Sequence, residues 1–230
     1  MIAENIRAVR ENICRVCREC GRSPEEVTLV AVSKTKPVSM IQEAADAGQT
    51  VFGENHVQEL TEKTKAFPQL EWHMIGHLQR NKVHQVLGKV SLIHSLDSLR
   101  LAEQIEKEAE KKGLLVPVLI EVNEAKEESK YGFFPEEAEE AVRQIASFPH
   151  IRVRGLMTIA PYVEDPEKNR PVFRELAQFF VDMRSKNIHN VSMEHLSMGM
   201  TNDYLVAVSE GATMVRVGTG IFGERQYQNR

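Results

Sequence analysis

The stretch Leu115-Val-Pro-Val-Leu-Ile-Glu-Val122 decides the fold class, because it is short, apolar and rich in β-branched residues, as buried strands are. An amphipathic helical pattern precedes it, running from Asp97, a favourable N-cap residue, to Lys111. A second helical pattern follows at 135–147, with a proline and acidic residues in its first turn. A strand between two helices is one unit of an alternating α/β chain, which predicts a parallel sheet.

The same alternation extends from this unit to both ends of the chain. The predicted strands are residues 27–32, 50–52, 72–75, 90–94, 115–122, 153–159, 191–195 and 214–217. The predicted helices, after an N-terminal one, are residues 39–47, 56–65, 81–87, 97–111, 135–147, 169–185 and 203–210. Without a linker or a change of composition, this pattern predicts one domain over residues 1–230, a single (β/α)8 barrel of TIM type with an extra N-terminal helix. An open doubly wound sheet is the alternative.

The composition argues against several classes of partner. The formal net charge of -4 gives no electrostatic attraction to nucleic acid, whose binding depends on Lys and Arg that neutralise phosphates. The chain has no long apolar run that could span a membrane, and residues 1–10 lack the apolar core of a secretion signal. We therefore expect a cytoplasmic protein with no nucleic-acid and no membrane partner.

The three cysteines lie close together at Cys14, Cys17 and Cys20, a spacing similar to part of an iron–sulfur ligand run. The chain has no fourth cysteine, and the segment has the period of a helix. On a helix, steps of three place these small side chains near one face, where they pack easily. We expect no metal site here, and the odd cysteine count fits a reducing compartment.

Two lysines follow the first predicted strand, in Leu29-Val-Ala-Val-Ser-Lys-Thr-Lys-Pro37. Barrel chemistry is placed at the carboxyl ends of strands, and a lysine desolvated there becomes a nucleophile toward aldehydes. Lys34 and Lys36 share a face of an extended chain, so strand parity does not separate them. Because Lys36 precedes Pro37, we expect it further from the barrel axis. The spacing alone leaves open that both are ordinary solvated lysines.

The last predicted strand continues into a glycine-rich turn, Met214-Val-Arg-Val-Gly-Thr-Gly-Ile-Phe-Gly223. The spacing matches the dinucleotide fingerprint, but that motif needs another strand and a later acidic residue, and the chain ends at Arg230. In barrels, the loops after strands seven and eight often hold a phosphate. Backbone N–H groups of residues 218–220, the Thr219 hydroxyl and the polar loop 197–203 could form such a site. Tight turns without a ligand are the alternative.

Further polar side chains are predicted at the same rim. Arg216 lies within an apolar strand and is costly to bury without a partner, so it forms either a structural ion pair or a donor toward a ligand. Asn55 follows the second strand and His77 the third. A metal site formed by His73 and His77 is unlikely, because a glycine separates them at a strand end. The loop around Lys130 is consistent with a rim position or with an ordinary charged loop.

Taken together, these motifs resemble the pyridoxal phosphate homeostasis proteins, whose barrel is similar to the N-terminal domain of bacterial alanine racemases. The resemblance covers nearly the whole chain and is carried by seven stretches in order. They are Gly21-Arg-Ser-Pro-Glu-Glu26, Ala31-Val-Ser-Lys-Thr-Lys-Pro37, Phe52-Gly-Glu-Asn55, Trp72-His-Met-Ile-Gly-His-Leu-Gln79, Arg154-Gly-Leu-Met157, Leu196-Ser-Met-Gly-Met200 and Met214-Val-Arg-Val-Gly-Thr219.

The resemblance implies a role for each candidate site residue. Lys34, and not Lys36, would hold pyridoxal 5′-phosphate as a Schiff base, and Arg216 would face the pyridine nitrogen. Asn55 would lie near the ring and its phenolic oxygen, with His77 in a supporting role. The phosphate would be bound, largely through backbone groups, by Ser197, Met198, Gly218 and Thr219.

The resemblance also implies a function in intracellular vitamin B6 homeostasis and amino-acid balance, by storing, buffering or delivering the cofactor. An arginine leaves the pyridine nitrogen unprotonated, which makes the ring a poorer electron sink. Alanine racemases are active with that arrangement, but they add a second base from a further domain, which this chain does not include. We therefore expect a non-catalytic binding protein, a monomer or weak homodimer, with apo pyridoxal phosphate enzymes as candidate recipients. A racemase or decarboxylase of low activity is the alternative, and a phosphosugar aldolase barrel ranks below both.

Overall fold

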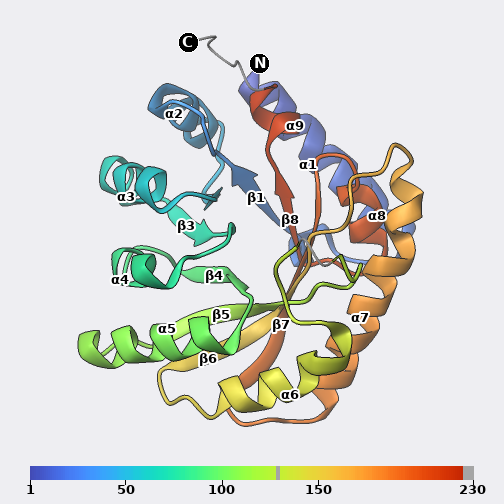
Figure 1. Cartoon of the computed structure of the whole chain (residues 1–230). Helices are drawn as coiled ribbons and strands as arrows, with labels where there is room; N and C mark the ends of the chain where they lie inside the picture. The colour runs from blue at the N-terminus through green and yellow to red at the C-terminus, as the bar shows by residue number, and fades with distance from the viewer. Residues whose placement is uncertain (128–129, 225–230) are drawn as a thin grey trace.

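The computed structural model describes residues 1–127 and 130–224, and its strands form one closed parallel barrel in chain order, β1 to β8 (Figure 1). Each strand pairs with its sequence neighbours, and β8 closes the ring against β1. The strands are β1 Thr28–Val32, β2 Val51–Glu54, β3 Glu71–Met74, β4 Leu92–Leu96, β5 Val116–Glu121, β6 Ile151–Met157, β7 Val191–Met200 and β8 Met214–Val217. The predicted (β/α)8 barrel is confirmed, and the open sheet is wrong.

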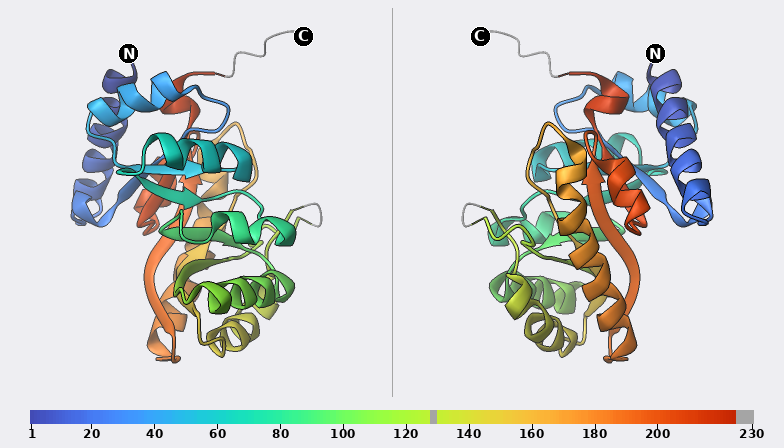
Figure 2. Two further views of the ribbon diagram at one scale, coloured as in Figure 1. Left: turned by 90° about the vertical axis from the view of Figure 1, so that its left-hand side faces the viewer. Right: turned by 90° about the vertical axis from the view of Figure 1, so that its right-hand side faces the viewer.

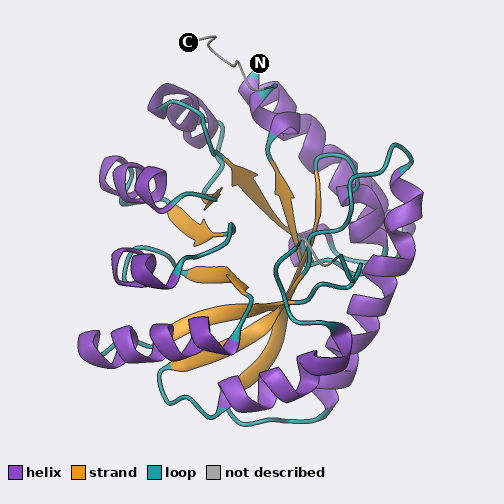
Figure 3. Cartoon of the chain, viewed as in Figure 1, coloured by secondary structure: helices purple, strands orange, loops and turns teal. Residues whose placement is uncertain are grey.

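Helices surround the barrel (Figure 3), as the alternating pattern predicts. In chain order they are α1 Ile2–Glu19, α2 Val38–Asp46, α3 Val57–Ala66, α4 Val83–Val86, α5 Leu99–Lys112, α6 Pro135–Ala146, α7 Arg170–Ser185, α8 Tyr204–Ser209 and α9 Thr219–Phe222. Short 3-10 turns at Pro24–Glu26, Arg80–Lys82 and Pro166–Asn169 complete the connections. None of the described helices is long and apolar enough to cross a bilayer.

The N-terminal helix α1 is the element outside the βα repeat, and it packs beside α2, α8 and α9 on the outer surface (Figure 2). One stripe of apolar residues recurs at helical spacing and is buried: Ile2, Ile6, Val9, Ile13, Val16 and Cys17. A helix with one apolar stripe must bury it against other elements, and here the stripe covers the side of the ring where β8 meets β1.

The seventh strand differs most from its prediction, because β7 runs to Met200 and not to His195. Residues 196–200 alternate apolar and small side chains, but serine and glycine have a low preference for strands, and it is β6 and β8 that provide hydrogen-bond partners on both sides. The neighbouring Gly155 allows β6 and β7 to approach closely, since a Cβ there would lie 1.8 Å from the carbonyl oxygen of His195. Tertiary pairing therefore overrides the weak local preference of this segment.

Two helix boundaries also differ. The N-cap of α5 is Ser98 and not Asp97, because the Ser98 hydroxyl accepts the Leu101 N–H at 3.3 Å. The Asp97 carboxylate is instead engaged by His77. The predicted helix 81–87 is divided into a 3-10 turn and the short α4.

Inside the barrel, a layer of apolar side chains is followed, toward the carboxyl ends of the strands, by a layer of polar side chains. Leu92, Leu119, Met157 and Met214 form a small buried cluster, separate from the large layer between strands and helices. Two residues further along β4 and β8, on the same faces, lie His94 and Arg216, both buried. The interior therefore changes from apolar to polar toward the carboxyl ends of the strands.

Candidate functional site

A cavity of about 740 Å³ opens at the carboxyl ends of the strands, where function is placed in this architecture. Its described lining combines cationic, amide and hydroxyl groups with apolar walls. The lining residues are Val32, Lys34, Asn55, Ile75, Ile159, Pro161, Tyr162, Met200, Thr201, Asn202, Asp203, Arg216, Gly218 and Thr219. Segments far apart in the sequence thus meet at one concave surface, with a lysine from the β1 end and an arginine from β8.

The two candidate lysines occupy different places. Lys34 is partly buried and lines the cavity. The Lys36 ammonium instead donates to the carbonyl oxygens of Phe222, Gly223 and Glu224, at 3.3, 3.0 and 3.0 Å. It thereby caps the carboxyl end of α9, as a cation there is expected to do. Strand alternation could not distinguish the two lysines, and this tertiary contact of Lys36 does so.

Behind Lys34 lies a buried ion-pair network that the sequence did not indicate. The Lys63 ammonium on α3 donates to Glu54 Oε1 at 2.6 Å, to Glu59 Oε2 at 2.7 Å and to the Ser33 carbonyl at 2.8 Å. The Ser33 hydroxyl also donates to Glu54 Oε1, at 2.6 Å. Burial raises the pKa of Glu54, and Lys63 opposes that shift. The network connects Ser33, the residue before Lys34, to Glu54 at the carboxyl end of β2.

The turn that carries Lys34 is anchored on its other side as well. Thr35 has a φ of 62°, which is uncommon for a residue other than glycine, and its N–H donates to Glu59 Oε2 at 2.8 Å. Glu59 therefore connects the Lys34 turn to the Lys63 ammonium. Both neighbours of Lys34 in the chain are held by one network, which limits the positions its backbone can take.

Arg216 is almost completely buried, at 3% exposure, and yet lines the cavity. Its Nη1 donates to Ser197 Oγ at 2.5 Å and its Nη2 to the Thr158 carbonyl at 2.8 Å. In the described part of the chain these hydrogen-bond partners are neutral, so of the two alternatives for Arg216 the structural ion pair is not the one observed. Burial lowers the pKa of Arg216 to about 10, against the opposing effect of Glu121 and Asp203, so it remains charged at neutral pH.

Of the expected phosphate-binding residues, two line the cavity and two do not. Gly218 and Thr219 line the cavity, whereas Ser197 and Met198 are fully buried on β7. Ser197 contacts Arg216 through its hydroxyl, and Met198 packs in the layer between strands and helices. From the same connection, Met200, Thr201 and Asn202 reach the cavity instead.

Thr201 marks a point where backbone donors converge. Its Oγ1 accepts the N–H groups of Gly218 and Gly220, each at 3.3 Å. Gly220 has no room for a side chain, because a Cβ there would lie 2.9 Å from Val217 and 3.2 Å from Thr201. Two amides of the β8–α9 turn are thus directed at one oxygen atom beside the cavity, the arrangement of a small anion-binding concavity.

Asn55 and His77 lie in different surroundings. The Asn55 Oδ1 atom is buried at the cavity and, among the described residues, has no hydrogen-bond partner. A buried acceptor of this kind is costly, which suits a position that a ligand completes. His77 is outside the described cavity lining, where its Nδ1 lies 2.6 Å from Asp97 Oδ2 and its ring stacks on Tyr131 at 3.7 Å. Lys130, beside Tyr131, pairs with Glu127.

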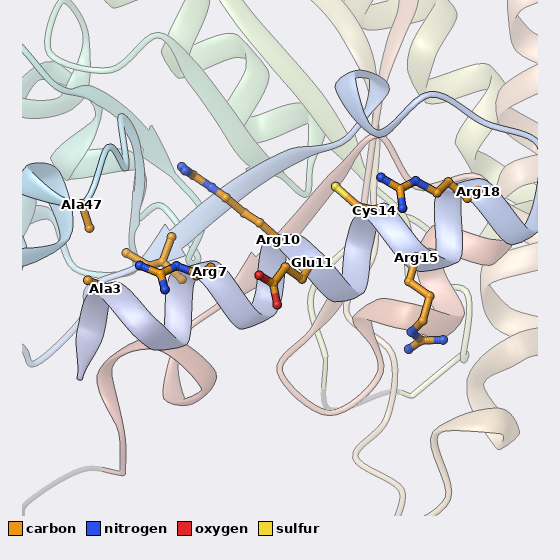
Figure 4. A pocket seen from close by; sticks show the side chains of 9 residues that line it. Ala3, Arg7, Arg10, Glu11, Cys14, Arg15, Arg18 and Ala47 are labelled. Carbon is orange, nitrogen blue, oxygen red and sulfur yellow. The ribbon is translucent and has the colours of Figure 1, made fainter.

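A second hollow, of about 470 Å³, lies along the outer face of α1 (Figure 4). Arg10 and Cys14 point to one side of the helix and Arg15 to the other. Arg10 already donates to Gly48 and Gln49, and Arg15 pairs with Glu19. This hollow lies on the outer surface of the barrel, and two of its arginines, Arg10 and Arg15, are engaged in structural contacts. The cavity with Lys34 and Arg216 is therefore the candidate functional site.

Comparison with known proteins identifies the family. The alanine racemase N-terminal domain family matches residues 5–226. The pyridoxal phosphate homeostasis protein of Aquifex aeolicus is 46% identical over 226 residues, covering 97% of this chain and 98% of the relative. That of Escherichia coli is 41% identical over 234 residues, covering 100% and 99%. The structure of PipY from Synechococcus elongatus with PLP bound is 34% identical, with a TM-score of 0.83, covering 97% and 100%.

A closed eight-stranded parallel barrel, with a lysine and an arginine lining a cavity at the carboxyl ends of its strands, is the architecture that this family match describes as an alanine racemase N-terminal domain. The chain belongs to the alanine racemase N-terminal domain family and, within it, to the pyridoxal phosphate homeostasis proteins.

Proposed function

We propose that this protein binds pyridoxal 5′-phosphate in the cavity at the barrel mouth, with the Lys34 amine joined to it as a Schiff base. The observation that carries the proposal is the shared lining of one cavity by Lys34 and Arg216, while Lys36 is held by three carbonyls of the α9 end. When bound, the cofactor supplies an aldehyde that condenses with a primary amine. The relative PipY, solved with PLP bound, supports the same ligand.

The residues present suit this cofactor in charge, size and hydrogen bonding. A cavity of about 740 Å³ lies within the range of cofactor sites. The amides of Gly218 and Gly220 converge on Thr201 Oγ1, and with the Thr219 hydroxyl they would become donors for a phosphate oxygen that takes the place of this hydroxyl as acceptor. The unpartnered Asn55 Oδ1 supplies a polar contact beside the ring. Ser197 would act through Arg216, and Met198 and His77 would support the site from outside the described lining.

We further propose that the protein stores, buffers or delivers the cofactor in vitamin B6 homeostasis and is not an amino-acid-converting enzyme. Arg216 can only donate, so a pyridine nitrogen facing it stays unprotonated and the ring withdraws electrons weakly. That chemistry favours a holder over a catalyst. The proposed partners are the cofactor and apo enzymes that use it, and the proposed state is a monomer or weak homodimer in the cytoplasm.

Spectroscopic titration of the purified protein with pyridoxal phosphate tests the binding proposal. We expect the wild type to develop the Schiff-base absorption band, Lys34→Ala to lose it, and the matched variant Lys36→Ala to keep it. Loss of the band in Lys36→Ala alone would contradict the assignment of Lys34. Rapid conversion of added amino acids to product by the wild type would contradict the non-catalytic role.

A further inference from the structure

A continuous line of polar side chains crosses the interior of the barrel from its amino end to Arg216. Glu71 Oε1 lies 3.0 Å from His73 Nε2, and His73 Nδ1 lies 3.0 Å from His94 Nε2. His94 Nδ1 lies 3.0 Å from Ser197 Oγ, which accepts from Arg216 Nη1 at 2.5 Å. Strands β3, β4, β7 and β8 each contribute to this line, which we call the interior chain.

The interior chain is sealed from solvent except at its first residue. His73 is 1% exposed, and His94 and Ser197 are fully buried. The Glu71 side chain, about half exposed, lines a hollow of about 310 Å³ at the amino ends of the strands, together with Ser91, His195 and other residues. One end of the interior chain thus meets solvent, and the other meets the cavity of the proposed cofactor.

The chemistry of the two ends determines where every hydrogen lies. Hydrogen bonding from His73, with a smaller contribution from Ser91, lowers the pKa of Glu71 against burial, so this carboxylate only accepts. His73 must therefore carry a proton on Nε2. With a single proton on the ring, its Nδ1 accepts, which places the proton of His94 on Nε2 as well. Burial, aided by His73, Arg216 and His195, lowers the pKa of His94 well below its usual value, so its Nδ1 accepts.

The assignment from the opposite end agrees. A guanidinium can only donate, so the Ser197 oxygen accepts from Arg216 and its hydroxyl hydrogen is given to His94 Nδ1. Every group in the interior chain donates toward Glu71 and presents its acceptor toward Arg216. The dipoles are aligned, with their negative ends directed at a buried cation whose described hydrogen-bond partners are neutral.

We infer that Glu71, His73, His94 and Ser197 are positioning residues for Arg216, orienting its guanidinium and stabilising its charge toward the cofactor. The inference rests on the proposed function, since the group that Arg216 would face in the bound cofactor is the pyridine nitrogen. Breaking the interior chain leaves the Ser197 hydroxyl able to turn, and the guanidinium loses its fixed acceptor. The described contacts of His94 are consistent with this role, because they join His73 to Ser197.

Nitrogen-15 NMR of the ligand-free protein tests the proton assignment independently of any cofactor. We expect both His73 and His94 to be neutral Nε2–H tautomers at neutral pH. A proton on Nδ1 of either ring, or a charged His94, would overturn the interior chain. This measurement needs no variant, so a failure of a substituted protein to fold leaves the inference testable.

Affinity measurements test the link to the cofactor. We compare His94→Leu, which breaks the interior chain, with His94→Gln, whose amide can both accept and donate. The probes are pyridoxal phosphate and its 1-deaza analogue, which lacks the ring nitrogen. We expect His94→Leu to weaken pyridoxal phosphate about tenfold, the loss expected for one hydrogen bond to a charged group. We expect the analogue to be unaffected and His94→Gln to recover most of the affinity.

The outcomes distinguish a failure of this inference from a failure of the proposed function. Equal weakening of both probes by His94→Leu would mean a merely structural role and would overturn the inference. Failure of the wild type to bind either probe would refute the proposed function while leaving the NMR result to decide the interior chain. Glu71→Ala removes the first acceptor of the interior chain and should act as His94→Leu does. Glu194→Ala is its matched control and should leave both affinities unchanged, because Glu194 lines the same hollow but pairs with Arg154 outside the interior chain.

Discussion

Lys34 and Lys36 are two residues apart and chemically identical, yet their surroundings assign them different tasks. One lines the cavity, and the other neutralises the carboxyl end of α9 through three carbonyl oxygens. A similar division separates Ser197 from Thr201, since the first is buried against Arg216 and the second receives the amides of the β8–α9 turn. At this scale, function depends on which neighbour a side chain meets.

Glu121 provides a test of electrostatics inside the barrel mouth. Burial raises the pKa of Glu121 to about 7, with Asp97 adding to the shift and Arg216 opposing it. An unfolded glutamate loses its proton near pH ~4.3, so between that pH and about 7 the folded state binds more protons. Folding stability from this group therefore falls as pH rises, by up to about 1.4 kcal/mol per pH unit.

We predict that Glu121→Gln removes this dependence. The free energy of unfolding of the wild type minus that of the variant should fall by about 3 kcal/mol between pH ~4.5 and ~7, and then stay constant. Urea unfolding across this range measures it, with the exposed Glu25→Gln as the control. A difference that rises with pH, or is flat, would be incompatible with a raised pKa.

At the scale of elements, most boundaries follow from the sequence, and the exceptions have tertiary causes. The apolar period of α1 and the apolar runs of β1 and β5 indicate those elements directly, because burial decides both pattern and structure. The extension of β7 does not follow from residues 196–200, since its hydrogen bonds depend on β6 and β8. Ser98 is the N-cap of α5 because Asp97 is engaged by a histidine from another loop.

The candidate site, too, is only partly predictable from the sequence. Lys34, Arg216 and the glycine turn are recognisable because strand ends and glycine spacing mark them. The role of Lys63 cannot be recognised from the sequence, since α3 contains another lysine and no pattern distinguishes the two. Only the fold brings Lys63 to Glu54. The signal that could have found it is Glu54, an acidic residue at the end of the buried strand β2, which needs a buried cation.

The β2–α3 network gives a prediction at this scale. Lys63→Met leaves the buried Glu54 carboxylate without its cation, which typically costs about 3–5 kcal/mol. Lys65→Met, on the same helix but exposed, should have almost no effect. Denaturant midpoints of the two variants measure the contrast. Equal midpoints would show that the ion pair contributes little to holding the Lys34 turn.

As a whole molecule, the protein is a barrel whose interior is not uniformly apolar. An apolar cluster fills part of it, and the interior chain runs through the rest, from the hollow at the amino ends to the cavity at the carboxyl ends. The strand termini bring Lys34 and Arg216 from opposite ends of the sequence to one cavity, because β8 closes against β1. Closure of the ring is therefore what creates the proposed site.

The central claim, that Lys34 carries the cofactor, is tested most directly by borohydride reduction of the protein saturated with pyridoxal phosphate, followed by peptide mass mapping. The account predicts a phosphopyridoxyl group on Lys34 and an unmodified Lys36. Modification of Lys36 with Lys34 unmodified, or no modified lysine after saturation, would contradict it.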